Sequence, residues 1–141
     1  MHFFEASSKI AASPDAIWTI LTDAQGYTTW DSGIDKVEGT IAPGEHITIH
    51  AAVNPGRAFP LKVAEFEPGK SMTWTGGMPL GLFVGVRTFT LTPAHDGTTE
   101  FHVREEYHGP MVPLIWGSMP DLAPSFSQFA NGLQAKAESE A

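Results

Sequence analysis

The sequence predicts an α+β fold, in which one strand and a short helical region precede a run of antiparallel strands and a long terminal helix. Three observations predict it. Residues 13–30 combine helix-capping residues with apolar residues at helical spacing. From residue 34 onward, apolar and polar residues alternate between turn sequences. After the prolines at positions 110, 113, 120 and 124, apolar residues recur with the period of a helix.

The N-terminal part predicts a strand followed by a helix. Residues 3–11 contain aromatic and β-branched residues with modest alternation, as strands do. Ser13 offers a hydroxyl as an N-cap, and Pro14 suits the first helical position because its missing N–H would have no partner there. We expect Gly26 to stop this helix. Its apolar face would consist of Ile17, Ile20, Leu21 and Ala24.

The middle of the chain predicts six further strands, at residues 34–41, 45–53, 59–66, 71–76, 82–92 and 98–107. Turn sequences rich in Pro, Gly, Asn and Asp separate them, at residues 42–44, 54–56, 67–70 and 96–97. In the third of these strands Leu61 and Val63 have one parity and Phe66 has the other. A β-bulge between them would let all three face the core.

The last two strands predict a register that places charges on the inner face. If Leu91 pairs with Phe101, Phe89 lies opposite Val103, because residues two apart along a strand share a face. The same register sets Arg87 opposite Glu105 and Gly85 opposite Tyr107. Arg87 and Glu105 therefore share a face with apolar residues.

The terminal helix is expected to begin near Asp121, with Pro124 in its first turn, because proline in a helix interior costs about 3 kcal/mol. Residues 112–118 form either a separate helical turn or a kinked extension of this helix. The apolar face of the helix would consist of Phe126, Phe129, Ala130, Leu133 and Ala137.

Composition narrows the classes of protein that fit. A length of 141 residues suits a single domain over residues 1–141. The formal net charge of −8 disfavours nucleic acid or an anionic membrane as a partner. No window reaches 18 apolar residues, and the start lacks the pattern of a signal peptide, so we expect a cytoplasmic protein without stable membrane insertion. The lack of cysteine excludes disulfides, thiolate nucleophiles and Cys-based metal sites.

Three segments resemble a known superfamily: SPDAIW…LTD in the helical region, RTFTLTPAHDGTTEF in the last hairpin, and the closing amphipathic helix. They are similar to the START-related helix-grip proteins, also called SRPBCC, and most of all to the polyketide cyclase/dehydrase-like branch. The resemblance covers nearly the whole chain. It implies two short helices after strand one and a strongly curved sheet of about seven strands that grips the last helix and leaves a cavity between them. We expect Trp18, Tyr27 and Trp30 to pack these helices onto the sheet. The resemblance leaves a second place open for Tyr27 and Trp30, at the rim of the cavity entrance.

Arg87 and Glu105 are the leading candidates for chemistry. They form either a structural ion pair or a functional site, since charges on a core face are expensive unless something requires them. In the functional interpretation, Arg87 anchors a carboxylate, enolate or phenolate of a ligand, and Glu105 or Tyr107 exchanges protons with it. A different strand register would separate the pair.

Aromatic and apolar residues are expected to line the same space, although the same residues would serve an ordinary core. Glycines at positions 76, 77, 81 and 85 leave volume unfilled, and residues 76–81 form a flexible loop suited to a lid. The predicted ligand-binding residues are Ile47, Ile49, Met72, Trp74, Phe83, Arg87, Phe89, Tyr107, Phe126 and Phe129.

Metal and cofactor chemistry find no support in the sequence. His46 and His50 have outward parity, as does His102, and no H-E-x-x-H motif occurs. Phosphate-binding glycine motifs and a Ser nucleophile elbow are also missing from the sequence. We therefore expect no metal and no cofactor.

Three hypotheses of function remain open. The first is a protein that binds a small hydrophobic molecule, aromatic or polyketide-like, with cofactor-independent cyclase or dehydratase activity as an extension. The second is a carrier of lipid or hydrophobic metabolites. The third is an interaction or stress-response module with a collapsed cavity, in which Trp74 would touch Phe129. The sequence leaves a monomer and a homodimer equally open.

Overall fold

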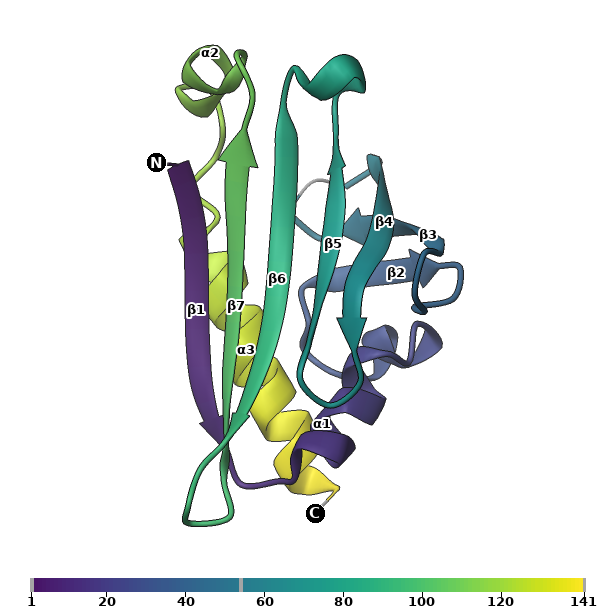
Figure 1. Cartoon of the computed structure of the whole chain (residues 1–141), viewed down its shortest axis with the longest axis vertical. Coiled ribbons are helices and arrows are strands. Elements are labelled where there is room, and N and C mark those ends of the chain that lie inside the picture. The colour runs from purple at the N-terminus through teal and green to yellow at the C-terminus, as the bar shows by residue number, and fades with distance from the viewer. Residues whose placement is uncertain (1, 54, 141) are drawn as a thin grey trace.

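A computed structural model of the chain, which describes residues 2–53 and 55–140, shows a curved antiparallel sheet that holds a long helix against one face (Figure 1). The seven strands are ordered β1-β7-β6-β5-β4-β3-β2. The predicted helix-grip fold is therefore confirmed. The predicted turn at Asn54 lies in part outside the described residues. The strands are β1 His2–Ile10, β2 Ile34–Glu38, β3 His46–Ala51, β4 Ala58–Glu67, β5 Ser71–Gly77, β6 Val84–Pro93 and β7 Thr99–His108.

The helices lie between the strands as predicted, with differences in their ends. The long helix α3 (Ala123–Ser139) has Pro124 in its first turn, and α2 (Val112–Trp116) is a separate short helix. α1 (Pro14–Leu21) is followed by the 3-10 helix η1 (Gln25–Thr29), and a second 3-10 turn, η2 (Pro79–Gly81), joins β5 to β6. In Figure 1, α3 runs behind β6 and β7 toward the end of the molecule where α1 lies.

The first helix starts as predicted and ends earlier. The Ala16 N–H donates to the Ser13 hydroxyl at 3.2 Å, so Ser13 is the N-cap. The prediction that the helix continues to Gly26 is wrong, because it ends at Leu21 and leaves Ala24 outside it. Asp23 accepts a hydrogen bond from the Gly26 N–H at 3.2 Å, and such local side-chain bonds compete with helix continuation.

The register of the sheet agrees with the predicted one in its decisive parts. Arg87 lies opposite Glu105, and Gly85 lies opposite Tyr107. The pairing of β4 with β5 shifts between Ala64 and Glu67, which confirms the predicted bulge. The bulge allows Val63 to be fully buried while Phe66 contacts Trp18, with ring centroids 5.2 Å apart.

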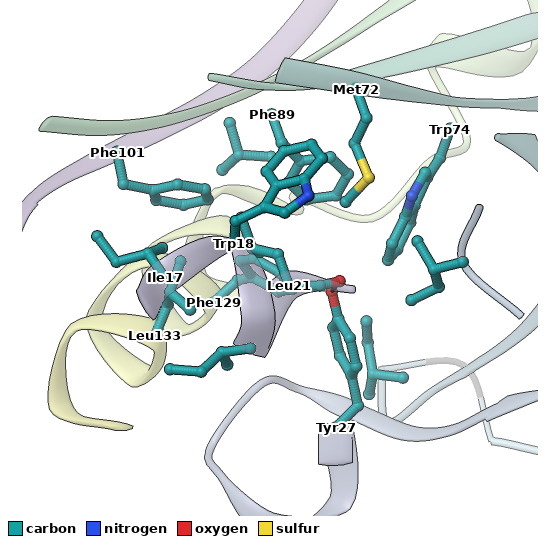
Figure 2. Close-up of a cluster of buried hydrophobic side chains, with 14 of the residues drawn as sticks. Ile17, Trp18, Leu21, Tyr27, Met72, Trp74, Phe89, Phe101, Phe129 and Leu133 are labelled. Atoms are coloured by element: carbon teal, nitrogen blue, oxygen red, sulfur yellow. Dashed lines mark hydrogen bonds between the residues drawn. The ribbon is translucent and has the colours of Figure 1, made fainter. Parts of the chain in front are cut away.

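A cluster of aromatic side chains fills the space between α3, α1 and the sheet (Figure 2). Phe89 lies 4.6 Å from Trp74 and 5.7 Å from Phe129, measured between ring centroids. Tyr27 belongs to this cluster, with 0% exposure and its hydroxyl donating to the Leu21 carbonyl at 2.6 Å. The expectation that Tyr27 packs the helical region onto the sheet is therefore confirmed, and its alternative place at the rim of an entrance is wrong, because η1 directs the ring under the sheet. Trp30 beside it is half-buried.

Candidate functional site

Two neighbouring rows of residues cross the inner face of the sheet and form the candidate site. In one row, Trp74 on β5, Arg87 on β6 and Glu105 on β7 lie side by side. In the next row, Gly76 pairs with Gly85, which pairs with Tyr107. Two positions without side chains therefore adjoin the tyrosine and the ion pair.

Arg87 and Glu105 form an ion pair that solvent reaches. The Arg87 Nε donates to Glu105 Oε1 at 2.8 Å, and the side chains are 24% and 18% exposed, respectively. The guanidinium carbon lies 4.7 Å from the centre of the Phe126 ring on α3, which adds a cation–π contact. The pair is thus held between the sheet and the helix without being sealed from water.

Tyr107 places a phenol next to this pair. The residue is only 6% exposed, and its hydroxyl has no hydrogen-bond partner within the described part of the chain. Burial, together with the neighbouring Glu105 carboxylate, raises the pKa of Tyr107 above its ordinary value. A phenol with the ordinary pKa of tyrosine is already protonated at neutral pH, and the raised pKa keeps Tyr107 a donor at higher pH as well.

Two buried tryptophans add donors of the same kind. The Nε1 atoms of Trp74 and Trp30 are buried, and neither has a hydrogen-bond partner among residues 2–53 and 55–140. Leaving a buried donor unpaired costs about 1–3 kcal/mol, so such groups call for an explanation. Trp74 lies directly across from Arg87 in the sheet, whereas Trp30 packs on Phe129 at 5.2 Å beneath α3.

The two glycines of the second row have different roles. A Cβ atom on Gly76 would lie 2.5 Å from Leu61 Cδ2 and 2.7 Å from the Pro60 carbonyl oxygen, so strand packing requires glycine there. A Cβ on Gly85 would lie 3.1 Å from Glu105 Oε2 and 3.4 Å from Tyr107 Cε1. Gly85 therefore lets the Glu105 carboxylate and the Tyr107 ring lie close to the backbone of β6.

The structure divides the predicted ligand-binding residues into two groups. Phe83 stacks on Tyr107 at 5.7 Å, so it joins the polar group together with Arg87, Trp74 and Phe126. The other five lie in the packed core and are at most 6% exposed, and their contact with a ligand stays a prediction. These five are Ile47, Ile49, Met72, Phe89 and Phe129.

Trp74 and Phe129 are linked through other rings. Phe89 contacts both of them, and Tyr27 lies 6.0 Å from Trp74 and 6.2 Å from Phe129. This part of the interior is filled by aromatic side chains. Gly85 and Tyr107 lie one row further along the strands.

Sequence reasoning missed two aromatic neighbours of the site. Phe4 on β1 and Trp116 on α2 lie 6.2 Å and 5.6 Å from the Tyr107 ring, and 5.2 Å from each other. Phe4 has a usable signal, because its alternation in strand β1 puts it in the row of Glu105. Trp116 has none, since its position depends on α2 folding back over the sheet edge.

A surface hollow of about 520 Å³ adjoins the opposite side of Tyr107. It is lined by the ends of β1 and β7 and by α2, at His2, Tyr107, His108, Val112 and Pro113. Tyr107 thus lines this hollow and also lies in the row next to the Arg87–Glu105 pair.

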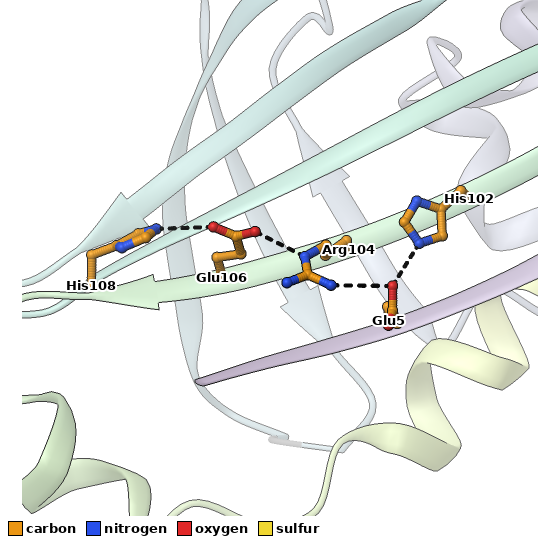
Figure 3. A network of polar contacts seen from close by, with 5 residues as sticks. All are labelled: Glu5, His102, Arg104, Glu106 and His108. Atoms are coloured by element: carbon orange, nitrogen blue, oxygen red, sulfur yellow. Dashed lines mark hydrogen bonds and ion pairs between the residues drawn. The ribbon is translucent and has the colours of Figure 1, made fainter. Parts of the chain in front are cut away.

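His46, His50 and His102 lie on the outer face of the sheet, as their parity predicted. His50 bonds Glu38 and His102 bonds Glu5, each at 2.8 Å (Figure 3 shows the second pair). Within residues 2–53 and 55–140, no group of three or more metal-ligating side chains is found. No helix in the same part of the chain is long and apolar enough to span a membrane.

Comparison with known proteins places the chain in a family. The family described as polyketide cyclase/dehydrase and lipid transport matches residues 1–138, so the chain belongs to it. The match supports the resemblance drawn from the helical segment, the hairpin and the last helix. A comparison with curated proteins finds no match.

Solved structures share the fold at low sequence identity. A protein from Mesorhizobium loti is 20% identical, with 99% of this chain and 98% of that chain covered and a TM-score of 0.74. The ZhuI aromatase/cyclase from Streptomyces sp. R1128 is 14% identical, with 99% and 94% covered and a TM-score of 0.75. A dimeric protein from Colwellia psychrerythraea is 18% identical, with 98% and 97% covered and a TM-score of 0.73. At these identities the likeness shows the fold alone.

Proposed function

We propose that this protein binds a small hydrophobic molecule at the inner face of the sheet, beside Arg87, Glu105 and Tyr107. The observation that carries the proposal is the pair of buried donors without acceptors, the Tyr107 hydroxyl and the Trp74 N–H, next to an ion pair that solvent reaches. A ligand oxygen would complete their hydrogen bonding. An ordinary core would have no reason to keep these polar groups together.

The charges of the site favour a ligand with an uncharged oxygen-bearing group over a ligand that is a strong anion. Glu105 already offsets the positive charge of Arg87 at 2.8 Å, so the pair as a whole is neutral. A carbonyl, enol or phenol oxygen can accept from Tyr107 or Trp74 without that neutrality being lost. The rings of Phe83 and Phe126 would contact the apolar body of the ligand. An aromatic, polyketide-like or lipid molecule with one polar group fits this description.

A cofactor-independent cyclase or dehydratase is the second candidate, and the placement of Tyr107 and Glu105 in neighbouring rows on one face of β7 favours it. In such a reaction, Glu105 would accept a proton from a carbon next to a ligand carbonyl. Arg87 would stabilise the enolate that forms, and the protonated Tyr107 would donate to its oxygen. A Streptomyces aromatase/cyclase has the same fold, which supports the scaffold as suitable for this chemistry. Turnover of a poly-β-keto substrate by the native chain, and its loss in Tyr107→Phe, would support catalysis over binding alone.

Carriage of a lipid or hydrophobic metabolite is the non-catalytic form of the same proposal. Native mass spectrometry of gently purified protein would detect a co-purifying ligand and give its mass. The same measurement would distinguish a monomer from a homodimer, such as the Colwellia relative forms.

The binding proposal is tested by titration with Nile red, an uncharged dye with a carbonyl oxygen whose fluorescence rises in apolar sites. Gly85→Ala places a methyl group 3.1 Å from Glu105 Oε2, and we expect roughly tenfold weaker binding. Gly117→Ala is the matched control, because no atom lies within 4 Å of the added Cβ. Equal affinity in the native chain and in Gly85→Ala would contradict the proposed site.

A further inference from the structure

Two stretches without charged residues meet at one end of the molecule. Residues 71–86 and 109–120 contain no Asp, Glu, Lys or Arg, in a chain of which 17% of the residues are charged. In Figure 1 their connecting parts, η2 and α2, lie at the same end of the sheet. The Met111 N–H donates to the Leu82 carbonyl at 2.9 Å, and a Cβ on Gly109 would lie 2.6 Å from the Gly81 carbonyl oxygen. The two stretches therefore form one continuous surface.

This surface carries most of the exposed large apolar side chains. Among the described residues these side chains are five, and four of them belong to the two stretches, while Val53 lies in the turn after β3. Leu80 is 96% exposed and Leu114 is 71% exposed. We call the four residues the apolar tip: Met78, Leu80, Leu82 and Leu114.

Leu80 is unfavourable in two ways in the protein alone. Its φ of 62° lies in the left-handed region, which residues other than Gly and Asn rarely adopt. Its side chain is at the same time almost fully in water. Strain of this kind persists mainly where it serves a function. An exposed leucine held outward at the end of a loop serves recognition of an apolar surface.

The backbone of the tip is suited to a medium that lacks water. Prolines at positions 79, 110, 113 and 120 carry no N–H group. Among the other N–H groups of the two stretches, Met78 donates to the Phe83 carbonyl at 2.7 Å and Ile115 donates to the Met111 carbonyl at 3.0 Å. Irregular backbone enters a lipid surface only when its polar groups are satisfied.

We propose that the apolar tip docks onto the interfacial layer of an electrically neutral lipid surface. The net charge of −8 opposes an anionic surface, whereas the uncharged tip matches zwitterionic lipid and offers no charge for pairing with a protein partner. Insertion would be shallow, limited to the tip side chains.

Docking of the apolar tip would bring the lipid surface close to the candidate site. Leu82 precedes Phe83, whose ring stacks on Tyr107 at 5.7 Å. A hydrophobic ligand would therefore pass between the lipid and the inner face over a short apolar path. This consequence rests on the proposed function, but docking itself does not.

Co-sedimentation with phosphatidylcholine vesicles tests the proposal. We expect the native chain to bind, and Leu80→Asn and Leu114→Gln each to weaken binding roughly tenfold, because each removes one leucine from the lipid. Asn tolerates a positive φ, so Leu80→Asn is expected to raise the melting temperature, which separates lost docking from unfolding. Ala94→Asn, in the exposed turn after β6 at the opposite end of the sheet, is the control and should bind like the native chain.

Three results would overturn docking. The first is that the chain does not bind neutral vesicles, and the second is that binding requires phosphatidylserine. The third is a concentration-dependent dimer that Leu80→Asn abolishes, because this would show that the tip binds a second copy of the chain. Failure of the Gly85→Ala titration would leave the vesicle result unchanged, so the two proposals fail separately.

Discussion

The two faces of β7 carry polar groups under opposite conditions. On the inner face, Glu105 pairs with Arg87 beside donors that lack acceptors among the described residues. On the outer face, charged side chains join into an extended network at the surface (Figure 3). Glu5 Oε1 accepts from His102 at 2.8 Å and from Arg104 at 3.3 Å, and Glu106 accepts from Arg104 at 2.8 Å. The outer-face network consists of Glu5, His102, Arg104, Glu106 and His108.

The difference teaches which polar residues signal function. Charges that alternate onto a solvent face are screened by water and contribute little individually. Charges on the inner face must be dehydrated in part, so evolution would replace them with apolar residues if only stability were selected. The inner pair is therefore the informative one, although the outer network contains more charges.

The largest loss of stability is expected from a substitution in the packed part of the inner face. Phe89→Ala would remove a fully buried ring between Trp74 and Phe129, and we expect a loss of about 3–5 kcal/mol in the free energy of unfolding. Urea denaturation measures it. Phe3→Ala is the matched change in a half-buried outer-face ring on β1, and its loss should be much smaller. Similar losses in both variants would contradict the contrast between the faces.

The second-largest loss of stability is expected from breaking the Arg87–Glu105 ion pair. Arg87→Met leaves the 18%-exposed Glu105 carboxylate without its partner, and we expect a loss of about 1–3 kcal/mol. The double variant Arg87→Met with Glu105→Leu should recover most of this loss, because a buried pair is often replaceable by apolar residues. Both variants should lose affinity for Nile red. A double variant as unstable as the single one would argue that the pair is mainly structural.

Removal of the phenol hydroxyl should separate stability from binding. Tyr107→Phe deletes a group without an acceptor within the described residues, so the free energy of unfolding should change by less than about 1 kcal/mol. Affinity for an oxygen-bearing ligand should fall in the same variant. A marked loss of stability would indicate that the hydroxyl already has a partner in solution.

The smallest effect is expected on the outer face, and it depends on pH. The hydrogen bond from His102 and the Arg104 guanidinium hold the pKa of Glu5 below its ordinary value of 4.5. The stability that this provides is fully present above pH 4.5 and is lost as the pH falls through the lower pKa of the folded state. In Glu5→Gln, stability should therefore fall less than in the native chain as the pH drops below 4.5. Melting temperatures measured over a range of about pH 3 to 7 test this. If the melting temperature of Glu5→Gln depended on pH as that of the native chain does, the role given to Glu5 would be contradicted.

Local signals in the chain predicted much of the fold and one part of the site. Ser13 and Pro14 mark the start of a helix through hydrogen bonds within four residues. A short turn joins β6 to β7, so apolar alternation alone was enough to place Arg87 opposite Glu105. The bulge near residue 65 followed from a change of parity in the same strand. In each case the partners are close in sequence or linked by a tight turn.

Tertiary structure decided the features that depend on distant segments. The contacts of Trp116 and Phe4 with Tyr107, and the donors without acceptors among the described residues, arise where α2, α3 and β1 fold against the inner face. The sequence by itself determined that a charged pair would face the core. Only the folded chain decided that solvent reaches the pair and that these donors lie beside it, because the curvature of the sheet and the path of the last helix set those distances.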